Sequence, residues 1–189
     1  ELGRMYHKGR MYWHATLLAR TIGWTDKLFY IREHYESYFS SKTGLPVTAL
    51  RDVQEGPKYK RYNKVHFNQQ ENYLKSKATG RMDIPARTFD VVAVFYAMRN
   101  SVLRNIGHQK DTIRFKLYFD KKIYNMHVVY EGKETIKTAF GRIRCMKFIP
   151  LVVAGRVFDS KEDVTLWISD DRNLIPIRAR MKLLIGSFR

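Results

Sequence analysis

The sequence predicts a mainly β protein, with a strongly curved antiparallel sheet or a partly closed β-barrel and one prominent amphipathic helix. Most segments alternate between apolar and polar residues with a period of two, which is typical of strands. One segment instead has helical spacing. Aromatic residues, which favour pleated and half-buried surfaces, make up 14% of the chain. No linker rich in Pro, Gly or Ser divides it, so we expect residues 1–189 to form a single β-rich domain.

The N-terminal half reads as a succession of strands. In Met11–Arg20 the side chains of Trp13, Ala15 and Leu17 share one face, and their neighbours share the other. A turn is expected at Gly56-Pro57, because proline would interrupt a ladder of backbone hydrogen bonds. The further predicted strands are Phe29–Phe39, Val47–Glu55, Lys58–Asn68 and Asn72–Ala78.

The period changes between Phe89 and Arg104, where apolar residues recur at helical spacings. Thr88 is a suitable capping residue, Asp90 suits the positive end of the helix dipole, and Gly107 suits the exit. We therefore predict an amphipathic helix that packs against the sheet. Its apolar stripe consists of Val91, Val94, Phe95, Met98 and Val102.

Strands resume after the helix. Turns are expected near Asp120-Lys121-Lys122 and at Gly132-Lys133. The predicted strands are Ile113–Phe119, Tyr124–Tyr130, Thr135–Ile149 with a bend or bulge at Gly141, Val164–Ser169 and Leu174–Ser187. This gives roughly nine to eleven strands, and sheets of that size tend to curl or close because exposed edges are a liability.

Composition limits the classes of partner. The net charge of +17 favours polyanions such as nucleic acid, acidic polysaccharide or anionic lipid, although a solvated basic surface has the same composition. Cys145 is the only cysteine, so no intramolecular disulfide can form. The longest apolar runs, Val91–Met98 and Phe148–Gly155, are too short for a transmembrane helix.

No motif marks an active site. The sequence lacks a P-loop, a dinucleotide-binding glycine fingerprint and a nucleophile elbow. The histidines lack the spacings that place two imidazoles on one face, so neither a metal nor a cofactor is predicted. Cys145, beside Arg144, fits a buried small hydrophobe better than a nucleophile. Asp170 and Asp171 fit a turn better than an acid and base pair. We therefore predict that the protein is not an enzyme.

The segment Lys58–Lys64 interleaves cations with tyrosines. Proteins that bind single-stranded nucleic acid use such surfaces, because bases stack on the rings and phosphates follow the cations. A strand with one solvated face produces the same pattern, and the aromatic signature of RNA-recognition sheets is missing. Nucleic acid is therefore the less favoured partner.

Four segments carry a resemblance to a known family: Gly9–Thr16, Tyr35–Tyr38 with Gly44–Pro46, Phe89–Arg99 and Leu166–Pro176. Together the chain resembles the exported bacterial family called domain of unknown function 3108. The resemblance implies an envelope protein made with a signal peptide, and a curved, barrel-like antiparallel sheet related in general shape to lipoprotein carriers. The chain begins at Glu1 rather than Met, so we expect a trimmed product. The family has no established activity, so no functional residue can be carried over.

These observations predict a non-enzymatic envelope protein, located in the periplasm or associated with the outer membrane. It would bind an apolar or lipid-like ligand on a concave sheet face, or an anionic envelope polymer on its basic outer faces. A basic nucleic-acid-binding β domain and a hydrolase with an unrecognised site remain the alternatives. The side chains expected to line the apolar site, each of which also fits an ordinary core, are Trp13, Phe95, Phe115, Trp167 and Met181.

Overall fold

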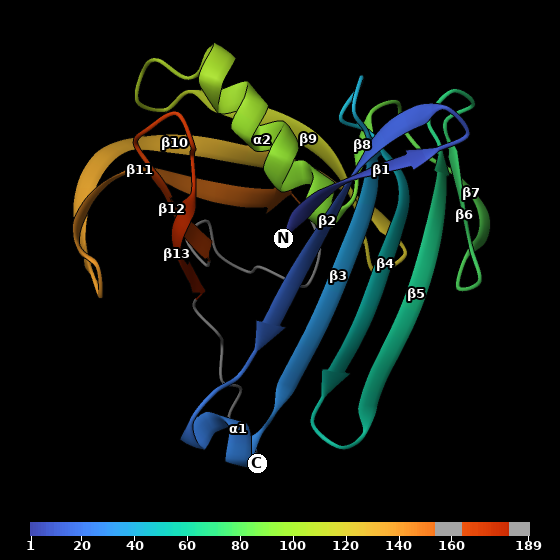
Figure 1. The fold of residues 1–189 in the computed structure, drawn as a ribbon, viewed down its shortest axis with the longest axis horizontal. Coiled ribbons are helices and arrows are strands. Elements are labelled where there is room, and N and C mark those ends of the chain that lie inside the picture. The colour runs from blue at the N-terminus through green and yellow to red at the C-terminus, as the bar shows by residue number, and fades with distance from the viewer. Residues whose placement is uncertain (154–163, 182–189) are drawn as a thin grey trace. The chain divides into compact units, whose positions relative to one another are not determined.

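The computed structural model describes residues 1–153 and 164–181, and its described part is mostly β, as the sequence predicts (Figure 1). The strands form two sheets, of which one is strongly curled into a half-barrel. One sheet has the order β1-β2-β3-β4-β5-β6-β7, and the other has the order β13-β12-β11-β10-β9-β8. The pairs for which a register is defined are antiparallel except β8–β9, which is parallel.

The strands and helices have the following bounds: β1 Leu2–His7, β2 Arg10–Arg20, α1 Trp24–Leu28, β3 Ile31–Ser40, β4 Pro46–Glu55, β5 Tyr59–Asn68, β6 Tyr73–Ser76, β7 Gly80–Asp83, β8 Thr88–Phe89, α2 Val91–Asn105, β9 Thr112–Phe119, β10 Lys122–Thr138, β11 Gly141–Val153, β12 Val164–Ser169 and β13 Pro176–Met181. The chain divides into two compact units, Glu1–Ala97 with Lys116–Ile123, and Met98–Phe115 with Tyr124–Arg189. That residues 1–189 form a single domain stays a prediction.

In the first unit, the alternation of β2 to β5 separates a buried face from an exposed one. Each strand pairs with its neighbour in the chain, so the buried side chains form rows across the sheet. One row consists of Ala15, Ser37, Ala49 and Val65, all buried. The start of α2 packs on this face, where the ring of Tyr96 lies 5.3 Å from that of Phe39. A cluster around Leu74 and Phe67 closes the core at the β5–β7 end.

The helix α2 begins two residues later than predicted. Asp90, and not Thr88, is the N-cap, because its Oδ1 accepts hydrogen bonds from the backbone amides of Val92 and Ala93 at 2.8 and 2.9 Å. The Thr88 hydroxyl instead donates to the Pro85 carbonyl. Thr88 therefore belongs to the short strand β8, which pairs with β9.

In the second unit, β10 and β11 form a long hairpin whose turn the sequence pattern places at the wrong position. The turn expected at Gly132-Lys133 is a bulge within β10, where the register shifts between Tyr130 and Gly132. The continuous strand expected over Thr135–Ile149 is instead broken between Thr138 and Gly141. The predicted strand Leu174–Ser187 is confirmed as β13 only over Pro176–Met181, and residues 182–189 lie outside the described part.

Candidate functional site

A pocket of about 270 Å³ lies in the first unit, and all of its lining residues belong to that unit. Its walls come from β3, β4 and β5, the start of α2, and the β9–β10 turn. The strand register explains which side chains face it. Tyr35, Arg51 and Asn63 stand directly opposite one another on three neighbouring strands, with their side chains on the buried face of the sheet. The residues next to them in the chain, such as Glu36 and Tyr62, have side chains of the opposite orientation and also contribute to the pocket lining.

Arg51 is the central cation of this pocket. Its side chain is 17% exposed, and its guanidinium lies 4.6 Å from the centre of the Phe119 ring. One terminal nitrogen is 3.5 Å from Asp120 Oδ1. The Nε of Arg51 is buried and has no hydrogen-bond partner. Aromatic rings, one long ion pair and a hydrogen bond with the Tyr35 side chain therefore position the guanidinium, while its Nε–H stays unused.

Two further pocket residues carry buried polar atoms without a partner, the hydroxyl of Tyr118 and Oδ1 of Asn63. Among the described residues four such side-chain atoms occur, and three of them belong to residues that line this pocket. A buried polar group without a partner costs about 1–3 kcal/mol, so a water or ligand atom that pairs with these groups would be stabilised here. The three atoms are not themselves exposed, so a ligand reaches them only after the side chain turns.

The β9–β10 turn supplies the acidic side of the pocket. Asp120 and Lys121 adopt positive φ angles of 45° and 67°, as two central residues of a tight hairpin turn do, which confirms the turn predicted here. The carboxylate of Asp120 forms an ion pair with Arg61 as well as with Arg51. Aspartate tolerates the left-handed conformation, and these two cations hold its carboxylate over the pocket.

Asp90 lines the pocket at the start of α2. Burial raises its pKa to about 6, although Ser37 and the backbone amides of Ala93 and Val92 act in the opposite direction. Its Oδ2 accepts a hydrogen bond of 2.6 Å from the hydroxyl of Ser37. Because both carboxylate oxygens are engaged, Asp90 has the geometry of a helix cap rather than of a general acid.

The residues that the sequence singled out lie elsewhere. Trp13 on β2 and Phe95 on α2 are half-buried in the first unit, and Phe115 and Trp167 are buried in the second unit. Met181 ends β13, and its side chain lies outside the described part. Trp13, Phe95, Phe115 and Trp167 do not line the pocket. Trp167 donates from its indole nitrogen to Glu134 and lies beneath the guanidinium of Arg180 at 5.2 Å.

Sequence reasoning missed Tyr35, Arg51, Asn63, Tyr118 and Asp120. One signal for Arg51 was present, because in the predicted strand Val47–Glu55 this cation shares a face with Ala49 and Val53. A charge on an otherwise apolar strand face is informative, since burying it requires a partner. The other members depend on strand register, which alternation alone does not supply.

The remaining reactive groups have structural partners. Asp171 Oδ1 accepts hydrogen bonds from the backbone amides of Asn173 and Leu174, as a turn residue does, and Asp170 pairs with Lys133 and Arg144. Cys145 is fully buried, and burial raises the pKa of its thiol. The described residues contain no cluster of His, Cys, Asp or Glu suited to a metal ion. Within the same residues, no helix is long and apolar enough to cross a membrane.

The family model described as protein of unknown function (DUF3108) matches residues 4–189. No curated protein and no solved structure matches the chain.

Proposed function

This chain belongs to the DUF3108 family of proteins of unknown function, and from that premise we propose that it is a non-enzymatic binding protein of the bacterial envelope. Its pocket holds a small amphipathic ligand that carries a carboxylate or a phosphate group. The compartment, periplasmic or associated with the outer membrane, is proposed from the family resemblance of the sequence. The ligand class is proposed from the pocket.

The row Tyr35–Arg51–Asn63 is the observation that carries the ligand proposal. A guanidinium is the side-chain group best matched to the planar oxygens of a carboxylate or phosphate. Arg51 has an unused Nε–H, and Tyr118 has an unused hydroxyl, so two donors become available to the anionic group once these side chains turn. The unpaired oxygen of Asn63 is an acceptor for a hydroxyl or amine elsewhere on the ligand.

The size and walls of the pocket limit the rest of the ligand. A volume of about 270 Å³ suits a small molecule or a lipid head group rather than a whole lipid chain. Apolar side chains, including Ala49, Val65 and Val92, complete the lining. The apolar or lipid-like ligand expected from the sequence is therefore proposed here in a narrower form, with a charged end and a short apolar body.

Thermal unfolding in the presence of simple anions tests the ligand proposal, with inorganic phosphate, acetate and hexanoate as probes. A ligand that binds only the folded state raises the midpoint of unfolding in a concentration-dependent way. We expect hexanoate or phosphate to stabilise the wild type and to lose this effect in Arg51→Met. The control Arg81→Gln removes an exposed cation on β7, outside the pocket, and should retain it.

Arg51→Met also removes a partner of Asp120. Tyr118→Phe therefore serves as a second variant, because it leaves the ion pair between Arg51 and Asp120 in place. Equal stabilisation of the wild type and both pocket variants would contradict the proposal. So would a lack of stabilisation by every probe, combined with native mass spectra that show no small molecule bound to protein purified from its own host.

The compartment is tested separately. Fractionation of the native host, followed by detection of the full-length gene product, should place the protein in the periplasmic or outer-membrane fraction. Recovery in the cytosolic fraction would contradict the envelope part of the proposal and leave the ligand part standing.

A second candidate function is binding of an anionic envelope polymer by the exposed face of β5, β6 and β7. This face alternates cations with tyrosines, and the side chain of Tyr62 is 63% exposed. Affinity for acidic polysaccharide should fall steeply with salt and fall further in Lys64→Gln with Lys75→Gln. Stronger binding to single-stranded nucleic acid would favour the nucleic-acid alternative instead. The members of this face are Lys60, Tyr62, Lys64, His66, Tyr73, Lys75 and Arg81.

A further inference from the structure

The connection between β2 and β3, which contains α1, exposes four large apolar side chains. Ile22 is 73% exposed, Trp24 69%, Leu28 71% and Phe29 52%. All four lie within eight residues of one another, and we call them the α1 patch. Single exposed apolar residues are ordinary on a protein surface, but a group of four in one short connection is not.

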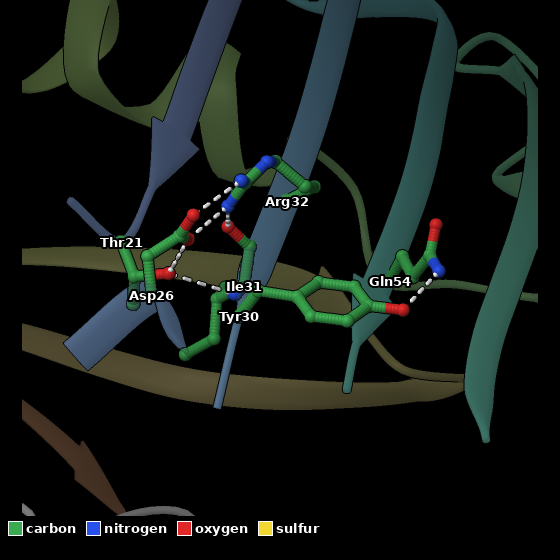
Figure 2. Close-up of polar contacts among 6 residues, drawn as sticks. All are labelled: Thr21, Asp26, Tyr30, Ile31, Arg32 and Gln54. Carbon is green, nitrogen blue, oxygen red and sulfur yellow. Dashed lines mark hydrogen bonds and ion pairs between the residues drawn. The ribbon is translucent and has the colours of Figure 1, made fainter. Parts of the chain in front are cut away.

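A polar network holds this connection in a defined shape (Figure 2). The carboxylate of Asp26 accepts two hydrogen bonds from the guanidinium of Arg32, at 2.6 and 2.8 Å, and a third from Thr21 Oγ1 at 2.6 Å. The hydroxyl of Thr21 in turn accepts from the backbone amide of Ile31 at 3.0 Å. Arg32 and then Thr21 hold the pKa of Asp26 well below its usual range, so this fork-like ion pair persists in mildly acidic solution.

A second set of contacts joins the same connection to the neighbouring hairpin. The hydroxyl of Tyr30 accepts from Gln54 Nε2 at 2.8 Å, as Figure 2 shows, and the Tyr30 carbonyl accepts from the amide of Gly56 at 2.8 Å. The polar side chains of the connection are therefore paired with one another or with residues of β3 and β4. The apolar side chains of the patch are left on the outside of a connection that is already closed by hydrogen bonds.

The segment from Arg20 to Arg32 carries three cations and one anion. Arg20 and Lys27 are exposed on either side of Trp24 in the chain, while the charge of Asp26 is balanced by Arg32. The whole chain carries a net charge of +17. A second copy of the chain would thus be repelled, whereas an anionic surface would be attracted. Apolar side chains flanked by two cations, with a tryptophan among them, match the interface of an anionic bilayer.

We propose that the α1 patch docks the protein on the surface of an anionic phospholipid bilayer. Trp24 lies at the level of the head groups, and Ile22, Leu28 and Phe29 reach the acyl-chain boundary. Arg20 and Lys27 contact lipid phosphates. This inference rests on the α1 connection alone and does not depend on the pocket or its ligand.

Co-sedimentation with vesicles tests the proposal, using phosphatidylcholine vesicles with and without phosphatidylglycerol. We expect wild-type protein to bind the anionic vesicles and to bind pure phosphatidylcholine much more weakly. Trp24→Ser combined with Leu28→Ser should weaken binding by about a hundredfold, because each lost apolar contact weakens it about tenfold. Arg20→Gln combined with Lys27→Gln should weaken it by about fivefold for each charge removed.

Matched controls separate binding by the α1 patch from non-specific binding by other exposed apolar or cationic side chains. Phe140→Ser removes a side chain that is 94% exposed at the β10–β11 turn, and Lys137→Gln with Arg142→Gln removes two exposed cations of the same hairpin. Phe140→Ser should bind as the wild type does, and the charge control should retain most of its affinity. Vesicle binding by the Trp24 and Leu28 variant and thermal stabilisation of the wild type by soluble hexanoate are separate measurements, so failure of the pocket proposal and failure of this one are distinguishable.

Several results would overturn the proposal. They are absence of binding to anionic vesicles, equal binding to both vesicle types, and unchanged binding by the Trp24 and Leu28 variant. If Phe140→Ser weakened binding as much as the Trp24 and Leu28 variant does, binding could not be assigned to the α1 patch. A dimer that the Trp24 and Leu28 variant dissociates, without vesicle binding, would assign the patch to a second copy. Circular dichroism tests whether each variant is folded. The comparison of the two lipid compositions uses wild-type protein alone, so it does not depend on the folding of any variant.

Discussion

The hydroxyl of Ser37 donates a hydrogen bond of 2.6 Å to Oδ2 of Asp90, across 53 positions of the chain. Both residues are buried, with 0% and 5% exposure. The other oxygen of the same carboxylate caps α2 through the amides of Val92 and Ala93. One side chain therefore begins the helix and fixes its first turn on the middle of β3, beside the pocket.

Removal of the Ser37 hydroxyl should destabilise the protein. In Ser37→Ala the Oδ2 of Asp90 loses its donor in a buried position, so we expect the free energy of unfolding to fall by about 1–3 kcal/mol. Urea denaturation of Ser37→Ala, Asp90→Ala and the double variant measures the coupling between the two residues. Additive effects of the two substitutions would show that this hydrogen bond contributes nothing of its own.

Asp90 should also give the stability of the protein a particular pH dependence. Burial raises its pKa from 3.8 to about 6, so between these values the folded state holds a proton that the unfolded state releases. The contribution of Asp90 to the free energy of unfolding therefore falls as the pH rises through this range and is lowest above it. Asp90→Asn keeps an oxygen for the helix amides but cannot ionise.

The measurement is the difference in the free energy of unfolding between the wild type and Asp90→Asn at several pH values. We expect the two proteins to have similar free energies of unfolding near pH 3.8. Up to about pH 6, the free energy of unfolding of the wild type should fall steadily relative to that of the variant. A difference that is constant across this range would mean that Asp90 titrates in the folded protein as it does in the unfolded chain.

Much of this fold follows from alternation, and the failures have physical causes. All six residues of β1 are exposed, so no buried face marks it in the sequence. The helix α1 has five residues, too few to show a helical period. The turn between β10 and β11 contains the apolar Phe140, which made the hairpin resemble one long strand. Period-two patterns detect strands with one solvated face. They do not detect strands with both faces exposed, or elements too short to show a period.

The pocket was less predictable than the strands, because it depends on register. Arg51 could be flagged as a cation on an apolar face, but its alignment with Tyr35 and Asn63 exists only once β3, β4 and β5 are paired. Tyr118 comes from a distant segment that packs against Phe67, with ring centres 6.0 Å apart. Large aromatic residues such as Phe115 and Trp167 were natural candidates for a ligand site, and both are buried, as core residues are.

Tyr118→Phe should stabilise the protein when no ligand is bound. The hydroxyl of Tyr118 is buried without a partner, so its removal ends a desolvation penalty and leaves the packing on Phe67 intact. We expect the free energy of unfolding to rise by about 1 kcal/mol. Tyr38→Phe is the matched control, because the Tyr38 hydroxyl donates to Glu36 Oε2 at 3.1 Å, and its loss should have the opposite sign. If both variants lose stability equally, the Tyr118 hydroxyl has a partner in solution.

Two glycines in hairpin turns should respond differently to alanine. Gly44 and Gly56 both adopt positive φ angles, 69° and 60°, so alanine at either site costs about 1–2 kcal/mol of backbone strain. A Cβ at Gly44 would meet nothing within 4 Å, whereas one at Gly56 would lie 2.9 Å from Cε2 of Phe29. Gly56→Ala must therefore also displace the Phe29 ring, which is half exposed and belongs to the α1 patch.

We expect Gly56→Ala to lower the free energy of unfolding more than Gly44→Ala does, and to alter vesicle binding, which Gly44→Ala should leave unchanged. Repeating both substitutions in a Phe29→Ala background isolates the ring contact, since the two glycines should then cost the same backbone strain. If Gly56→Ala still costs more without Phe29, the difference lies in the turn itself. The ring would then not be what holds the β4–β5 turn against the α1 connection.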